Sequence, residues 1–97
     1  MAQEASTLRA IRSAYAHAKS VYTKHPSSAA KKNYVISTVR YGTASMLSPA
    51  LDRKVKYRQA LRLYREALKL DPKNEEARNN SEMIVSIYRQ MGRPVPK

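Results

Sequence analysis

The stretch YRQALRLYREALKLDPKNEEARNN, residues 57–80, decides which fold this chain can form. Its apolar residues recur at steps of three and four, so they share one face of a helix. That face consists of Tyr57, Ala60, Leu61, Tyr64, Ala67 and Leu68. The helix should end at Asp71-Pro72, because the residue before a proline avoids helical backbone angles. Asn74 is a favourable N-cap for a following helix. The stretch therefore predicts a helix, a short proline turn and a second helix.

The same periodicity extends to both ends of the chain. Helices are expected over residues 4–24, 28–47, 50–70 and 74–91, followed by an irregular tail at 92–97. The first ends at His25-Pro26, and Ser27 or Ser28 can cap the second. The start of the third helix stays open, since Ser48-Pro49 is typical of a helix start but strong periodicity begins only near Val55. The fold class predicted is all-α: about four antiparallel helices, without strands, in one small domain.

Two local features sharpen this prediction. Pro26, Pro49, Pro72 and Pro94 punctuate the 97-residue chain at nearly equal intervals, and the segments before Pro26 and Pro72 match position by position. Such self-similarity is typical of a helical repeat. Gly42 interrupts the second helix and predicts either a kink or a close helix contact there.

The residues of the central stretch resemble those of the tetratricopeptide repeat family. The resemblance rests on Tyr57, Ala60, Tyr64, Ala67, Leu68, Leu70, Asp71, Pro72 and Asn74, with Ala77 and Asn80 similar to the opening of the following repeat. It is strongest over residues 55–80, weaker over 8–47 and poor over 48–54. It implies small residues where helices cross, an aromatic side chain between neighbouring helices, and a role in protein–protein interaction.

Several positions depart from the family pattern. The second helix lacks the large aromatic residue and Leu-Gly pair of a first repeat helix, and Ser81 stands where a core leucine is typical. We therefore expect one central tetratricopeptide-like hairpin, formed by the second and third helices and flanked by the N- and C-terminal helices. This is fewer than the three repeats that usually make such an array stable, so self-association as a homo-oligomer or docking on a partner is expected to help.

The charge of the chain indicates an anionic partner. Lys and Arg number 19 against 7 Asp and Glu, a formal net charge of +12. On the third helix, four basic residues step by four, three and four and form one ridge. We call Arg58, Arg62, Arg65 and Lys69 the basic ridge. The ridge is either a solvated helix face or a binding surface for carboxylates or phosphates.

Two functions follow from these patterns. The favoured one is a small adaptor that binds an acidic protein or peptide, or sits in a larger assembly, through the face of the second and fourth helices. The alternative is an RNA-binding or ribosome-associated helical protein that contacts phosphates through the basic ridge and the Lys31-Lys32 pair. Its seven tyrosines could stack on bases, although such spacing more often marks a helix core. Predicted partner-binding residues are Lys31, Lys32, Arg58, Arg62, Arg65, Lys69, Asn79, Met83 and Ile87.

Other classes of function find no support in the sequence. Neither His17 nor His25 has an acid or nucleophile at a suitable spacing, and only two glycines are present, so no catalytic site, phosphate loop, metal site or cofactor site is expected. No apolar run reaches the roughly 20 residues of a membrane span. The absence of cysteine fits a reducing compartment, and a cytoplasmic location is expected. Residues 5–19, rich in Arg, Ser and Ala, leave organelle targeting open.

Overall fold

Four helices make up the fold, which is seen in a computed structural model that describes residues 2–97, with side chains from residue 7 onward. They are α1 (Ala2–Lys24), α2 (Ser28–Leu47), α3 (Arg53–Leu70) and α4 (Glu75–Gln90). No strand occurs in this part of the chain. The all-α prediction is thus confirmed.

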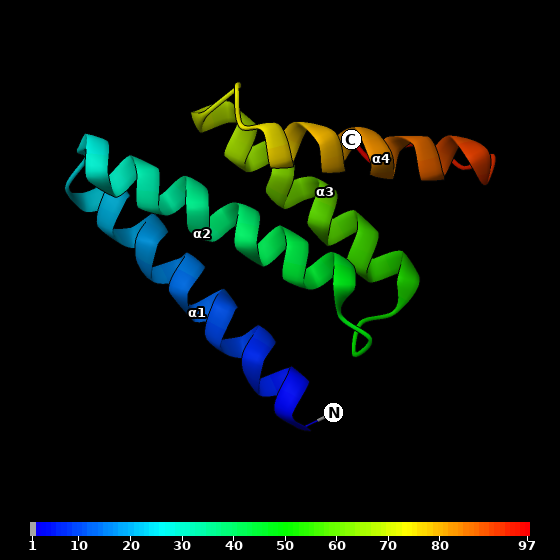
Figure 1. The fold of residues 1–97 in the computed structure, drawn as a ribbon, viewed down its shortest axis with the longest axis horizontal. Helices are drawn as coiled ribbons and strands as arrows, with labels where there is room; N and C mark the ends of the chain where they lie inside the picture. Colours follow the sequence, from blue (N-terminus) through cyan, green and yellow to red (C-terminus); the bar gives the residue numbers. More distant parts are fainter. Residues whose placement is uncertain (1) are drawn as a thin grey trace.

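Helices that follow one another in sequence are neighbours in space. α1 packs against α2, α2 against α3, and α3 against α4 (Figure 1). The hairpin of α2 and α3 has the most extensive packing and is flanked by α1 and α4, as expected. Short connections between sequential helices favour such antiparallel neighbours. α3 is consequently covered from two sides, by α2 and by α4.

The core is centred on α3. Ala60, Leu61, Leu63, Tyr64 and Ala67 of this helix are at most 1% exposed. Except for Leu63, these residues form one buried cluster with Val35, Val39, Ala77, Ile84 and Tyr88. Leu63 lies outside the predicted apolar face; because α3 is covered by two neighbours, its buried surface is wider than a single stripe.

Local capping explains where most helices begin. The side chain of Ser27 accepts a hydrogen bond of 3.0 Å from the amide of Ala30, and Asn74 accepts one of 2.9 Å from the amide of Ala77. Both N-caps were expected from the sequence. Ser48 behaves differently: it is the C-cap of α2, and its hydroxyl accepts a 3.2 Å bond from the Ala50 amide.

The connection between α2 and α3 corrects one prediction. The third helix was expected to start at residue 50 or near Val55, and it starts between them at Arg53, with Asp52 as N-cap. The interpretation of Ser48-Pro49 as a helix start is therefore wrong. The hydroxyl of Ser48 satisfies the amide of Ala50 in a turn instead, which leaves residues 48–52 as a non-helical connection.

Gly42 of α2 lies directly against the Tyr64 ring of α3. A Cβ atom at this position would lie only 3.0 Å from Cε1 of the Tyr64 ring. Tyr64 is fully buried, and its hydroxyl is hydrogen-bonded to Thr43 of α2 at 2.8 Å and to Asn80 of α4 at 3.1 Å. The close contact expected at Gly42 is thus found, and Tyr64 connects three helices.

The tail (residues 92–97) turns back over the helices. α4 ends at Gln90, and Gly92 has a φ of 67°, a left-handed conformation that favours glycine. The amide of Arg93 donates to the carbonyl of Tyr88 at 3.0 Å, and Val95 packs against the core cluster. The tail is non-helical, as expected, but it is folded onto the domain (Figure 1).

No helix within the described residues is both long and apolar enough to cross a lipid bilayer.

Candidate functional site: a basic groove along α3

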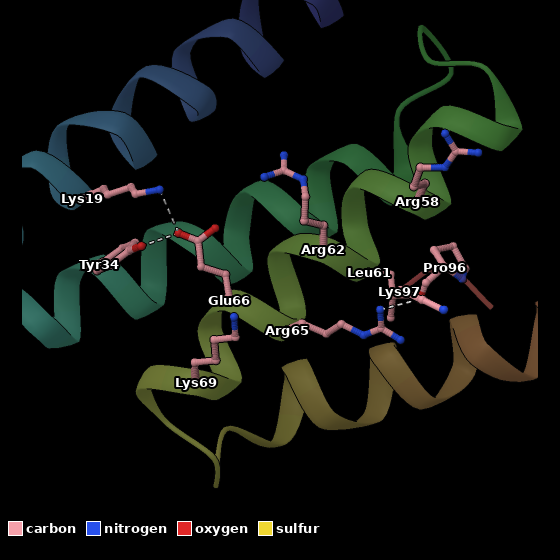
Figure 2. A pocket seen from close by; sticks show the side chains of 10 residues that line it. All are labelled: Lys19, Tyr34, Arg58, Leu61, Arg62, Arg65, Glu66, Lys69, Pro96 and Lys97. Carbon is pink, nitrogen blue, oxygen red and sulfur yellow. Dashed lines mark hydrogen bonds and ion pairs between the residues drawn. The ribbon is translucent and has the colours of Figure 1, made fainter.

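The four residues of the basic ridge lie together in one groove with a volume of about 700 Å³. Figure 2 shows their side chains projecting from α3 between α1 and α2 on one side and the tail on the other. The complete lining comprises Lys19, Tyr34, Arg58, Leu61, Arg62, Arg65, Glu66, Lys69, Pro96 and Lys97. We call this the basic groove: it has six cationic side chains and one carboxylate, that of Glu66.

Helical spacing explains why α3 presents these cations together. Residues three and four apart lie on the same side of a helix, so the ridge runs along the side of α3 opposite the buried face of Ala60, Tyr64 and Ala67. Packing of the small and aromatic residues fixes the rotation of α3, and this rotation directs the arginines into the groove. Arg58, Arg62 and Lys69 are exposed, whereas Arg65 is half-buried.

Glu66 is held by groups from α1 and α2 and makes no ion pair with the ridge. The Tyr15 hydroxyl donates one hydrogen bond that both carboxylate oxygens share, each at 2.9 Å, and Oε2 also accepts from the Tyr34 hydroxyl. The Nζ atom of Lys19 lies 3.6 Å from Oε2 of Glu66. Because the Lys19 side chain is 51% exposed, this ion pair is weak. The carboxylate thus ties α3 to α1 and α2 at one end of the groove (Figure 2).

These contacts alter the acidity of the neighbouring groups. Burial, together with the hydrogen bond to Glu66, raises the pKa of Tyr15 and that of Tyr34 above the usual value. The charge of Glu66 raises the pKa of the Lys19 ammonium. Around neutral pH the two hydroxyls therefore stay protonated and remain donors to the carboxylate.

The ridge cations are largely unpaired. Within the part of the chain that the structure describes, Arg58, Arg62 and Lys69 form no hydrogen bond or ion pair through their side chains. Arg65 is the exception, since its Nη1 donates a 2.6 Å hydrogen bond to the carbonyl oxygen of Pro96. Three guanidinium or ammonium groups are consequently available to an incoming anion.

A second basic pocket adjoins the groove at Arg58. It lies where the start of α3 meets the end of α4 and has a volume of about 300 Å³. Its lining consists of Asp52, Arg53, Lys54, Tyr57, Arg58, Tyr88, Met91 and Arg93. Because Arg58 lines both, positive charge continues along the full length of α3.

The other predicted partner-binding residues lie elsewhere. Lys31 and Lys32 are exposed at the start of α2, beside a pocket that includes Leu70 and Asp71 of the turn after α3. Asn79, Met83 and Ile87 belong to α4: Asn79 is exposed, Met83 is 44% exposed, and Ile87 is half-buried. None of these five residues lines the basic groove.

A further pocket lies between α2 and the start of α4. Thr43 of α2 donates a 2.7 Å hydrogen bond to Glu76 of α4. The pocket beside this bond, about 700 Å³ in volume, is lined by Ile36, Val39, Arg40, Thr43, Ala44, Asn74, Glu75 and Glu76. Its charges are mixed, so the concentration of positive charge occurs in the basic groove and not on this face.

The tyrosines belong to the helix interfaces. Tyr34, Tyr41, Tyr64 and Tyr88 are buried, and Tyr15, Tyr22 and Tyr57 are half-buried. Tyr15 packs against Tyr41 with ring centroids 5.3 Å apart, and Tyr22 against Tyr34 at 5.7 Å. The rings therefore serve packing between α1 and α2, in agreement with the core interpretation of their spacing.

Sequence reasoning missed several lining residues. Lys19, Tyr34, Pro96 and Lys97 come from α1, α2 and the tail, far from the ridge in sequence. One signal in the sequence pointed to a contact in this region: Glu66 is the only acidic residue among the many basic residues of α3, which suggests that its carboxylate has a specific partner. The partner itself depends on how α1 and α2 pack against α3.

Comparison with known proteins identifies no relative: no family model, no curated protein and no solved structure matches this chain. Among the described residues, no group of three or more His, Asp or Glu side chains is arranged to hold a metal ion.

Proposed function

We propose that this chain is a small tetratricopeptide-like adaptor whose basic groove binds an acidic protein or peptide segment. The observation that carries this proposal is the convergence of six cationic side chains around a single groove in which Arg58, Arg62 and Lys69 have no partner among the described side chains. Arginine forms charge-assisted, often bidentate hydrogen bonds with carboxylates, and these set the geometry of binding.

The packing around α3 supports the likeness to tetratricopeptide repeats. Ala60 and Ala67 are fully buried, as small residues at helix crossings are in that family. Tyr64 fills the space between α2 and α4, touching Gly42 and bonding to Asn80. These residues occupy the positions from which the resemblance was drawn.

The burial of the tyrosines favours an acidic protein over a nucleic acid. Single-stranded nucleic acids gain much of their binding energy by stacking bases on accessible aromatic rings. No lining tyrosine of the basic groove offers an open face for stacking: Tyr34 is 7% exposed and its ring packs between those of Tyr15 and Tyr22. Binding of RNA through electrostatic contact with its phosphates is the alternative result of the test described next.

The test compares two labelled probes, a ten-residue poly-glutamate peptide and a single-stranded RNA of ten nucleotides, by fluorescence anisotropy at several salt concentrations. The charge-reversal variant Arg58→Glu/Arg62→Glu alters exposed cations of the groove, so it should fold normally. We expect it to bind the peptide at least tenfold more weakly, because two favourable charge contacts become repulsive, each changing by about 1 kcal/mol or more.

A matched control carries the same change of charge elsewhere. Arg12→Glu/Lys24→Glu alters two exposed residues of α1 that line none of the pockets described above. It should retain most of the affinity. Equal losses in the two variants would mean that only net charge matters, and tight RNA binding without peptide binding would favour the nucleic-acid function.

A further inference from the structure

The tail closes one end of the basic groove. After the turn at Gly92, Val95 packs against the core cluster, and Pro96 and Lys97 line the groove. The carbonyl oxygen of Pro96 accepts the 2.6 Å hydrogen bond from Arg65 (Figure 2). One of the four ridge residues is therefore already occupied by the chain's own backbone.

The tail is electrostatically a poor ligand for this surface. It brings Arg93 and Lys97, two further cations, to a surface that already carries many. Among the described residues, the part of the tail beyond the Arg93–Tyr88 bond is held by the half-buried Val95 and Pro96 side chains and by one hydrogen bond from Arg65 to a neutral carbonyl. Such a bond is weaker than one from arginine to a carboxylate, and the like charges nearby oppose docking.

We propose that the tail is an internal competitor for the basic groove, and that an acidic segment displaces it and takes over Arg65. This inference rests on the proposed function above. The best-matched partner is an extended acidic segment with one apolar residue at the place of Val95, followed by carboxylates facing Arg65, Arg62 and Arg58. The tail shows that an extended chain carrying an apolar residue fits there.

The consequence for affinity follows from competition between the two occupants. A partner binds with full strength only to the fraction of molecules in which the tail is released, so a looser tail raises the apparent affinity. Two variants loosen it by independent routes. Val95→Ser removes the apolar anchor. Gly92→Ala places a Cβ in a left-handed backbone conformation without causing a clash, since no atom lies within 4 Å of that Cβ.

The experiment measures binding of a labelled acidic peptide, Leu followed by five Glu, to the full chain by fluorescence anisotropy. Heteronuclear ¹⁵N NOEs of the Val95 and Lys97 amides report tail docking in the same samples. We expect Val95→Ser and Gly92→Ala each to bind roughly threefold more tightly than the unmodified chain. Saturating peptide should lower the tail NOEs of the unmodified chain. Val55→Ser, at a 48% exposed valine, is the control and should change neither readout.

The outcomes separate this inference from the proposed function. Peptide binding with unchanged tail NOEs, and with unaltered affinity in both tail variants, would overturn the competition while the adaptor function stands. If the peptide binds none of the proteins at low salt, while the NOEs of the unmodified chain show a docked tail, then the proposed function itself is wrong. The proposed competition between peptide and tail is then wrong as well.

Discussion

Replacing Glu66 by glutamine should weaken the fold and strengthen binding at the same time. Of the acidic side chains that the structure describes, this carboxylate alone lines the basic groove, and it also joins three helices through the hydroxyls of Tyr15 and Tyr34. An amide has nearly the same shape as a carboxylate, so the variant keeps the packing and removes only the charge. The two effects therefore have one electrostatic cause and opposite signs.

The size of the stability loss follows from the hydrogen bonds. A bond to a charged acceptor contributes about 1.5–3 kcal/mol and a neutral one about 1 kcal/mol. Glutamine can accept from one tyrosine hydroxyl and donate to the other, so both bonds survive in weaker form. The ion pair with Lys19, whose side chain is 51% exposed, adds little. Each of the two bonds thus loses about 0.5–2 kcal/mol, and the free energy of unfolding should fall by about 1–4 kcal/mol in total.

The gain in binding is smaller. A negative charge at ~8 Å from a bound carboxylate, in surroundings close to water in dielectric constant, repels it by about 0.5 kcal/mol. Removing that charge should raise the affinity for an acidic peptide about twofold, and the gain should shrink with added salt.

Urea denaturation followed by circular dichroism measures the first effect, and anisotropy titration measures the second. Glu82→Gln is the matched control, because Glu82 is exposed on α4 and makes none of the contacts described; it should change stability by less than about 0.5 kcal/mol. The reasoning is refuted if Glu66→Gln is as stable as Glu82→Gln, or if it binds the acidic peptide more weakly than the unmodified chain.

Three further predictions concern the fold. Gly42→Ala should lower the free energy of unfolding by about 1 kcal/mol, because overpacking against the fixed Tyr64 ring outweighs the higher helix propensity of alanine. In a Tyr64→Leu background, the same substitution should raise the free energy of unfolding. A stabilising effect of Gly42→Ala in the unmodified chain would contradict this reasoning. Burial raises the pKa of Tyr34 and of Tyr64. As the pH rises, the unfolded chain loses these protons before the folded chain does. The stabilisation is therefore complete below about pH 10, and above it the free energy of unfolding falls by about 1.4 kcal/mol per pH unit for each tyrosine. Urea titrations at pH 8 to 11 that show no such fall would refute this. Asn74→Ala removes the cap bond to the Ala77 amide and should cost about 1 kcal/mol in thermal unfolding, against little change for an exposed serine such as Ser86.

Much of the fold could be predicted because it depends on neighbours in the sequence. The apolar face of α3 lies in the core as expected, and Ser27 and Asn74 cap their helices. Helical periodicity and capping need only a few consecutive residues, so they can be recognised without knowing what packs where.

The candidate site could be predicted only in part. Placing Arg58, Arg62, Arg65 and Lys69 on one side of a helix needs nothing beyond their spacing, and the structure indeed gathers them in one groove. Whether that groove binds a partner is the proposal made above.

The sequence by itself determined the four helices, the proline turns and the basic ridge, because each is encoded within one or two helical turns. Tertiary structure alone decided what surrounds the ridge. Tyr15 reaches Glu66 across 51 positions of the chain, and Pro96 reaches Arg65 across 31. Contacts of this range depend on the rotation and crossing of whole helices, which follow from how Tyr64, Ala60 and Gly42 pack together and not from any local pattern.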